Sequence, residues 1–387
     1  MRGRDTPKVT AFRSELRGWL ADNLDAETRE LAGRGLGLTG ADLERLRRWQ
    51  RRLDAAGWAA VSWPTEHGGR GAGALEQAAY AEEMEAAGAP GTVNPIGMAN
   101  IAPALMTYGT PEQQQFLLPR MRRGDDIWCQ GFSEPEAGSD LASLRTTAVR
   151  AGDEFIVNGQ KLWTTLAQSA DWCELLVRTD PDVPKHKGLS ALIVYMHLPG
   201  VEVRPLRTLT GDAEFNEVFF RDVRVPSSAL LGPEGAGWRV AMTTLNNERA
   251  GVLALALGSR RKVADLIDVA RKTARGSGVA TEDPIVRQAL AKAWLNAELL
   301  GLLGERSVRA AAAGLPPGPE GSLGKLVWAH CDELTCAAAE LALGPEALSG
   351  NWGRSRVYVR AMSIAGGTTQ VNKNIVATQV LGLPRGG

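Results

Sequence analysis

The stretch QGFSEPEAGSD (residues 130–140) opens a block of the chain whose pattern differs from the sequence on either side. From residue 127 to residue 226, short apolar runs alternate with turn residues, which predicts a small antiparallel β domain. Before this block, apolar residues such as Leu16 and Leu20 recur at spacings of three and four, which predicts amphipathic helices. After a glycine-rich linker at residues 230–238, helical periodicity returns and favours a helical bundle.

The three blocks predict three domains. We expect an N-terminal all-α domain at residues 1–125, a central β domain at 126–233 and a C-terminal helical bundle at 234–387. This order indicates the α+β class and excludes a Rossmann arrangement. The glycine cluster HGGRGAG (residues 67–73) lacks the preceding strand and the spacing of a dinucleotide fingerprint, so we interpret it as a loop between helices.

Composition excludes several classes of partner. The 387 residues carry 44 Lys and Arg against 44 Asp and Glu, so no overall field attracts nucleic acid or an anionic membrane. The sequence has no apolar run of membrane-spanning length and no secretory apolar core at its start, so we expect a cytoplasmic protein without a membrane span. Four cysteines without a CxxC pair and only four histidines argue against a disulfide framework or a metal site.

Two segments of the β block have the groups that a flavin requires, namely an aromatic wall and hydroxyl or backbone donors. In residues 130–140, Ser133 and Ser139 supply hydroxyl groups. In NGQKLWTT (residues 158–165), we expect a turn followed by a strand that places Trp163 and Thr165 on one face. Each segment taken alone also fits an ordinary turn or a core tryptophan.

Six segments, in order, resemble landmarks of the acyl-CoA dehydrogenase family and span nearly the whole chain. They are GWAAVSWPTEHGG (57–69), PEQQQFLLPRMRRGD (111–125), SEPEAGSD (133–140), NGQKLWTT (158–165), TGDAEFNEVFF (210–220) and GGTTQVNKNIVATQVLGLPR (366–385). The resemblance implies FAD as cofactor, an acyl thioester as substrate and an electron-transfer flavoprotein or similar acceptor. It also implies a β-barrel-like central domain and a C-terminal four-helix bundle, with FAD and thioester between them.

The resemblance assigns roles to individual residues. Residues 130–133 and Trp163 would contact the isoalloxazine ring, Thr165 would reach the N5 edge of the flavin, and Ser139 would lie near the pantetheine or pyrophosphate. The cofactor-binding residues implied in this way are Gln130, Phe132, Ser133, Ser139, Trp163, Thr165, Gly367, Thr368 and Gln370.

The reaction that the resemblance implies requires a base to take an α-proton while hydride leaves the β-carbon. In many family members this base is a glutamate directly before a Gly-Thr pair, but Gly366 occupies that position here. Other members take the base from a Glu-Arg pair on an earlier helix, and LNNERAGVLALALG (245–258) contains Glu248 and Arg249 among apolar residues. We therefore expect Glu248 to be the base; a solvated surface pair is the alternative.

The remaining substrate contacts are also implied by the resemblance. Arg249 would orient the site or bind the coenzyme A portion, with Asn246 as a weaker candidate and Ser139 as a further contact. The amide of Gly366, near a predicted helix start, would hold the thioester oxygen together with a flavin hydroxyl, which makes Gly366 the second catalytic residue. Without a side chain, Gly366 also leaves room for a bulky or branched acyl group.

Two segments depart from those that reach a neighbour's FAD in homotetrameric relatives. Residues 270–284 lack the expected Phe-Gly, and in residues 339–348 Glu340 stands where glutamine is expected. A carboxylate near a pyrophosphate is unfavourable. We therefore expect either an α2β2 heterotetramer with a related subunit or a homo-oligomer that holds FAD through fewer contacts.

Two alternative functions fit the same scaffold. One is a flavin monooxygenase or nitroso-forming oxidase, which needs no α-proton base. The other is a noncatalytic partner subunit of a heteromeric dehydrogenase. For the dehydrogenase, an enzyme of fatty acid or lipid metabolism, the acyl group stays open among fatty, branched, steroid side-chain and carrier-bound forms.

Overall fold

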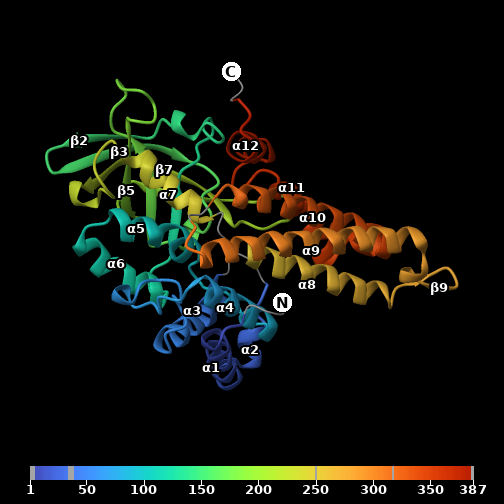
Figure 1. Cartoon of the computed structure of the whole chain (residues 1–387). Coiled ribbons are helices and arrows are strands. Elements are labelled where there is room, and N and C mark those ends of the chain that lie inside the picture. The colour runs from blue at the N-terminus through green and yellow to red at the C-terminus, as the bar shows by residue number, and fades with distance from the viewer. Residues whose placement is uncertain (1–4, 34–38, 249–250, 316–317, 385–387) are drawn as a thin grey trace. The chain divides into compact units, whose positions relative to one another are not determined.

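The computed structural model describes residues 5–33, 39–248, 251–315 and 318–384; the side chains of Glu248 and Glu320 lie outside this description. By contact, the chain forms two compact units: residues 18–72 with 88–248, and residues 1–17 with 73–87 and 249–387. Figure 1 shows the elements of both units. These two units do not coincide with the three domains that the sequence predicts, because the N-terminal region is divided between both units. The boundaries of the three domains stay a prediction.

The first unit contains a seven-stranded sheet in the order β1-β4-β2-β3-β7-β6, with β5 paired to β4. The strands are β1 (Trp128–Gly131), β2 (Thr147–Ala151), β3 (Glu154–Lys161), β4 (Trp172–Arg178), β5 (Leu189–Tyr195), β6 (Val201–Leu206) and β7 (Phe215–Pro226). Most pairings are antiparallel, as predicted, but β1 and β2 each pair with β4 in parallel. The sheet is therefore mixed, because strands distant in sequence meet at β4.

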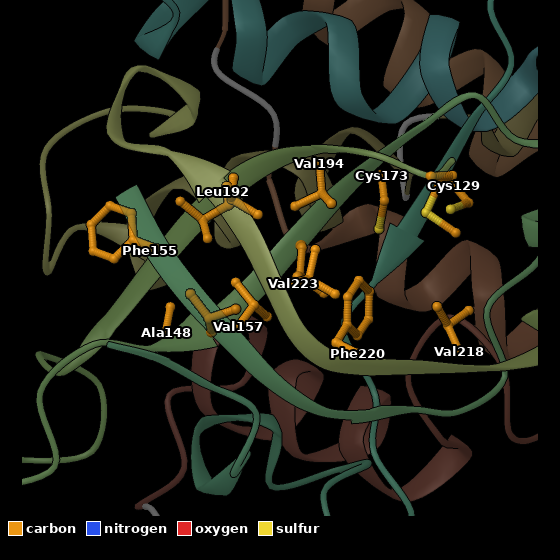
Figure 2. Close-up of a cluster of buried hydrophobic side chains, with 14 of the residues drawn as sticks. Cys129, Ala148, Phe155, Val157, Cys173, Leu192, Val194, Val218, Phe220 and Val223 are labelled. Carbon is orange, nitrogen blue, oxygen red and sulfur yellow. The ribbon is translucent and has the colours of Figure 1, made fainter. Parts of the chain in front are cut away.

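Alternation along the strands creates a dry core on one face of the sheet. Cys173, Leu175 and Val177 of β4 all join this core. Figure 2 shows side chains of β2, β3, β4, β5 and β7 converging there, with Phe155 and Phe220 among them. Cys129 and Cys173 lie on paired strands and are free thiols.

The Asn158-Gly159 dipeptide is not the turn that the sequence predicts. It lies inside β3, where the register with β7 shifts between Val157 and Gly159. The Asn158 side chain donates to Asp222 Oδ1 at 3.0 Å and accepts from the Asp222 amide at 2.9 Å. A Cβ at Gly159 would lie 2.7 Å from the Thr146 Cα, so a close approach of two backbones requires glycine here.

Helices cover the other face of the sheet. α7 (Gly237–Glu248) packs against β4, β5, α5 (Ala102–Tyr108) and the π-helical segment η2 (Ile96–Ile101). The apolar side chains on this side include Trp128, Ile193 and Val240. α7 is thereby fixed against the sheet along its length.

The N-terminal helices of the chain follow the predicted amphipathic pattern. They are α1 (Pro7–Asn23), α2 (Ala26–Arg29), α3 (Gly40–Ala55), α4 (Ala74–Ala87) and α6 (Pro111–Arg123). Thr110 begins α6 with a capping box, in which its hydroxyl accepts from the Gln113 amide at 3.2 Å. The glycine cluster at residues 67–73 lies between α3 and α4, as predicted for an interhelical loop.

Most of the second unit comes from the helices that follow residue 250 in the sequence (Figure 1). They are α8 (Val252–Ala270), α9 (Pro284–Ala312), α10 (Glu320–Leu343), α11 (Gly350–Met362) and α12 (Thr369–Ile375). A short hairpin, β8 (Ala274–Arg275) with β9 (Gly278–Val279), connects α8 to α9. The helical C-terminal region is confirmed.

α4 belongs to this second unit because it packs on α8 and α9. An ion pair between Arg261 of α8 and Glu85 of α4, at 3.0 Å, joins the two helices. Among the described helices, none combines the length and the apolar character needed to cross a membrane.

Candidate active site

A buried ion pair holds the loop that follows β1. Lys161, at the end of β3, is 0 % exposed, and its Nζ lies 2.8 Å from Glu134 Oε1 and 3.1 Å from the Phe132 carbonyl. The Glu134 carboxylate also accepts from the amides of Arg145 and Thr146, at 2.6 and 2.9 Å. Burial alone would raise the pKa of Glu134, but Lys161 and these donors hold that pKa below its usual value. The loop is therefore fixed at both of its ends.

The structure brings together the two segments predicted to bind flavin. The Ser133 carbonyl accepts a hydrogen bond from the Leu162 amide at 2.8 Å, so residues 130–133 lie directly beside residues 162–165. Gln130 and Ser133 are half-buried, and Gln130 Oε1 accepts from Asn100 Nδ2 at 3.3 Å. Polar groups of both segments therefore lie close together.

Trp163 and Thr165 do not lie on one face of a strand, and that prediction was wrong. β3 ends at Lys161, whose side chain points into the core and meets Glu134. Trp163 has a left-handed backbone (φ 61°) and is 57 % exposed, with its ring edge-on to Phe215 at 6.0 Å. A non-glycine residue in this conformation is uncommon and often marks a functional site.

Polar atoms beside Thr165 are buried without a partner in the described part of the chain. They are the Thr164 hydroxyl and the Asn216 side-chain oxygen. The loop itself is held by Asn216, whose Nδ2 donates to the Thr164 carbonyl at 2.9 Å. Buried polar atoms without partners are costly unless a ligand or water satisfies them. The hydroxyl groups and side-chain oxygens of this loop and of residues 130–133 therefore fit a polar aromatic cofactor.

The predicted base belongs to the helix that lies over the same sheet. Glu248 is the last residue of α7, while its side chain and Arg249 lie outside the described residues. Ala241 and Leu245 of α7 pack in one apolar cluster with Phe132. These contacts fix the last turns of α7 on this face of the sheet. Asn246 is exposed.

The C-terminal motif forms a tight loop before α12. Gly366 and Gly367 both have left-handed backbones, with φ of 65° and 84°, which favours glycine over glutamate at position 366. Thr368 begins α12 by accepting from the Val371 amide at 3.1 Å, so the predicted helix start is present. The amides of Gly366 and Gly367 donate no hydrogen bond to any described residue. They are available to an acceptor on a ligand.

Buried Asn372 stabilises this loop. Its Nδ2 donates to the carbonyls of Gly367 and Thr368, at 2.7 and 3.1 Å. Gln370 and Ser139 are exposed. The predicted residues from Gln130 to Thr165 and Glu248 belong to one unit, whereas those from Gly366 to Gln370 belong to the other.

Sequence reasoning missed four polar residues that the fold buries and pairs: Asn100, Lys161, Glu174 and Asn372. A usable signal existed for Glu174, because a carboxylate interrupts the otherwise apolar run of β4. The other three occur in ordinary polar contexts, and only the fold shows that they are buried or paired.

Three family models together match nearly the whole chain. They are the acyl-CoA dehydrogenase N-terminal domain at residues 6–125, the middle domain at 129–223 and the C-terminal domain at 235–381. The chain belongs to the acyl-CoA dehydrogenase family. This finding confirms the predicted family, fold class and enzyme class.

Relatives of this acyl-CoA dehydrogenase extend over its full length. It is 42 % identical to acyl-CoA dehydrogenase IpdE1 of Mycobacterium tuberculosis, covering 97 % of this chain and 98 % of the relative. Among solved structures, the Tcur3481-Tcur3483 steroid ACAD matches with a TM-score of 0.85 at 32 % identity, covering 99 % and 100 % of the two chains. The ChsE4-ChsE5 complex from Mycobacterium tuberculosis matches with a TM-score of 0.83 at 34 % identity, covering all of both chains.

The two segments that depart from homotetrameric dehydrogenases form helices and a short hairpin. Glu340 of α10 forms an ion pair with Arg356 of α11, and this pairing raises the pKa of the Arg356 guanidinium. The negative charge of Glu340 is therefore balanced by an arginine of the same chain. Residues 270–284 form the end of α8, the β8–β9 hairpin and the start of α9.

Proposed function

We propose that this acyl-CoA dehydrogenase binds FAD and introduces an α,β double bond into a bulky, steroid-derived acyl-CoA. The observation that carries the proposal is the hydrogen bond between Ser133 and Leu162, which joins the two predicted flavin segments beside the helix that ends at Glu248. No other described segment of that unit combines an exposed aromatic ring, half-buried hydroxyls and partnerless buried polar atoms.

Gln130, Phe132, Ser133, Trp163 and Thr165 would hold the cofactor ring. The exposed indole of Trp163 offers a flat apolar surface, and the half-buried hydroxyls of Ser133 and Thr165 offer donors to ring heteroatoms. Gly367, Thr368 and Gln370 would also lie beside the cofactor, and Ser139 near its pyrophosphate or the pantetheine of the substrate. When bound, FAD accepts the hydride that leaves the β-carbon of the substrate.

Glu248 would act as the base that removes the α-proton. A proton next to a thioester is only weakly acidic, so the negative charge that develops on the thioester oxygen must be stabilised at the same time. We assign that task to the amide of Gly366, whose hydrogen-bonding capacity is unused within the described residues. Arg249, with Asn246 as a weaker candidate, would contact the coenzyme A portion.

The steroid assignment rests on two supports. One matching structure, Tcur3481-Tcur3483, is a steroid ACAD, and the match covers 99 % of this chain. Gly366 has no side chain at the position where many relatives carry glutamate, which leaves space for a fused-ring acyl group. A screen of fatty, branched and steroid acyl-CoA thioesters for flavin bleaching tests the assignment. Faster bleaching by a straight fatty acyl-CoA than by every steroid thioester would contradict it.

We also propose a heteromeric assembly with a related subunit. Two matching structures, Tcur3481-Tcur3483 and the ChsE4-ChsE5 complex, each pair two differently named chains. In this chain, α9 exposes a row of large apolar residues, namely Ile285, Leu295, Leu299 and Leu302. Their spacing places them along one side of the helix, and an exposed apolar row of this kind favours burial against another subunit.

Replacement of Glu248 tests the chemistry. In Glu248→Gln, we expect the rate of flavin reduction by substrate to fall by roughly three powers of ten or more, because the α-proton has no acceptor. The rate is measured by anaerobic stopped-flow absorbance. Glu66→Gln, which neutralises an exposed carboxyl in a 3₁₀ turn, is the matched control and should reduce its flavin at the wild-type rate.

The same experiment separates the alternatives. If Glu248→Gln keeps the wild-type rate of flavin reduction, the base assignment is wrong and a monooxygenase or oxidase reaction is favoured. If the purified chain contains no flavin and stays inert until a second subunit is added, a noncatalytic role is favoured.

A further inference from the structure

β4 carries a carboxyl group that the reaction proposed above does not use. Along this strand, Cys173, Leu175 and Val177 face the dry core, so Glu174 points to the opposite face, the one that α7 covers. Its neighbours across the sheet are Gln130 on β1 and Ile193 on β5. Glu174 therefore lies next to a predicted flavin residue and beneath the helix that ends with the predicted base.

Glu174 is 0 % exposed and has no cationic partner among the described residues. Burial raises the pKa of its carboxyl to about 8, so the group is mostly protonated at neutral pH. The Thr244 hydroxyl lies 3.0 Å from each carboxyl oxygen. It also lies 3.4 Å from the Val240 carbonyl of the preceding helical turn, so the hydroxyl can accept from the carboxyl while donating to that carbonyl.

Apart from Gln130, the neighbours of this pair named by the apolar clusters are hydrophobic. On the same face, Leu176 joins the cluster of Phe132 and Leu245, while Trp172 and Ile193 join the cluster of Val240. An apolar side chain at position 174 would avoid the cost of burying a carboxyl group. What a buried, satisfied polar pair adds to such a contact is a defined geometry, because the helix cannot slide or rotate without breaking it.

Position 248 follows Thr244 by one helical turn, which is about 6 Å along the axis of α7. A constraint on the rotation and height of α7 at Thr244 is therefore also a constraint on its last residue. Misplacement of a reacting group by about 1 Å can cost on the order of 100-fold in rate. The contact between β4 and α7 thus has a direct consequence for the proposed chemistry.

We propose that the hydrogen-bonded pair of Glu174 and Thr244 locks α7 onto the sheet and thereby positions Glu248, so that Glu174 and Thr244 are positioning residues for proton abstraction. This inference rests on the proposed function of Glu248. It adds two residues of this chain that do not touch the substrate but set the geometry of the group that does.

Four variants of the FAD-loaded protein test the lock. Glu174→Leu and Thr244→Val remove the hydrogen bond while keeping the approximate side-chain volume. Glu174→Gln and Thr244→Ser keep a neutral hydrogen-bonding pair. We expect the first two variants to reduce flavin roughly 10- to 100-fold more slowly, with the substrate dissociation constant changed by less than about threefold. The two conservative variants should stay within about threefold of wild type.

A second measurement does not depend on activity. Hydrogen–deuterium exchange of the peptide that covers residues 237–248 should be faster in Glu174→Leu and Thr244→Val than in wild type, and unchanged in the two conservative variants. Thr335→Val is the matched control, because it removes a buried helix hydroxyl that donates to the Cys331 carbonyl of α10. It should change neither the exchange of α7 nor the reduction rate.

The outcomes are distinguishable. Unchanged exchange in Glu174→Leu and Thr244→Val overturns the lock. Faster exchange with an unchanged rate of flavin reduction overturns the positioning role. If Glu248→Gln itself reduces flavin normally, the proposed base fails, and the exchange data still decide whether the pair fixes α7. If Glu174→Leu and Thr244→Val fail to fold, the conservative variants Glu174→Gln and Thr244→Ser decide the question. A fall of more than tenfold in their rate of flavin reduction would overturn the proposal.

Discussion

Single residues of this dehydrogenase place ionisable groups in its buried interior, and these groups are stabilised in different ways. Lys161 and Glu134 remain a charged pair, because each satisfies the other and the backbone supplies further donors. Glu174 has only a hydroxyl as its partner, so it keeps its proton. The pKa values of the two carboxyl groups are therefore shifted in opposite directions, below the usual value for Glu134 and above it for Glu174.

The raised pKa of Glu174 predicts a pH-dependent stability. The unfolded chain loses this proton near pH 4.5, whereas the folded protein keeps it to about pH 8. The stability from the neutral carboxyl is thus complete below pH 4.5, falls as the pH rises and is lost above about pH 8. Relative to Glu174→Gln, the wild type should lose on the order of 5 kcal/mol across this window.

Thermal unfolding of both proteins between pH 5 and pH 9 measures this difference. Glu66→Gln, at an exposed site, should follow the wild type at every pH. A constant difference in melting temperature between wild type and Glu174→Gln over the whole range would show that Glu174 titrates normally in the folded protein.

At the scale of elements, the loop between β1 and β2 depends on a residue of β3. The pair of Lys161 and Glu134 fixes the segment that contains Ser133, and Ser133 in turn accepts from Leu162. The cofactor loop and the end of β3 therefore form one hydrogen-bonded structure rather than two independent loops.

Breaking this pair from one side should be costly. Lys161→Met leaves the Glu134 carboxylate buried without a cation, and we expect a loss of about 3–5 kcal/mol in the free energy of unfolding, together with lower flavin content. The double variant Lys161→Met with Glu134→Gln removes both charges and should recover a large part of that loss. Denaturant unfolding and the ratio of flavin to protein absorbance measure the two effects. Equal destabilisation of the single and double variants would contradict the charge argument.

At the scale of the whole molecule, two surface features of the C-terminal helices bear on how subunits assemble. The apolar row of α9 is exposed in the isolated chain, and Glu340 is neutralised by Arg356 instead of by another subunit. The exposed apolar row favours burial against another subunit, whereas the paired Glu340 does not by itself distinguish a related subunit from a second copy of this chain.

The mass of the purified protein tests the assembly. We expect the complex with a related subunit to be a heterotetramer, and Leu299→Glu to lower its mass, because a charge in an apolar contact is not compensated. Light scattering coupled to size exclusion measures the mass. Lys272→Glu, on an exposed turn after α8, is the control for an added negative charge on the surface of the bundle. A homotetramer of this chain alone with one FAD per chain would exclude the mixed-subunit assembly.

The sequence by itself determined the kind of element in each region and the family, because helical and strand periodicity and the six ordered motifs are local properties. It also identified residues 130–133 and 162–165 as parts of one site, which a hydrogen bond between Ser133 and Leu162 now joins. Their chemical roles and that of Glu248 stay predictions.

Only the tertiary structure decided where β3 ends and what its polar residues do. The Asn158-Gly159 pair has the local signature of a turn, but its bonds to Asp222 keep it within the sheet. Lys161, the last residue of β3, pairs with Glu134, which lies 27 residues away in the chain, and the backbone turns at Trp163. Likewise, Glu174 meets Thr244 across 70 residues. Such pairs depend on which segments the fold brings together, and no local pattern encodes that choice.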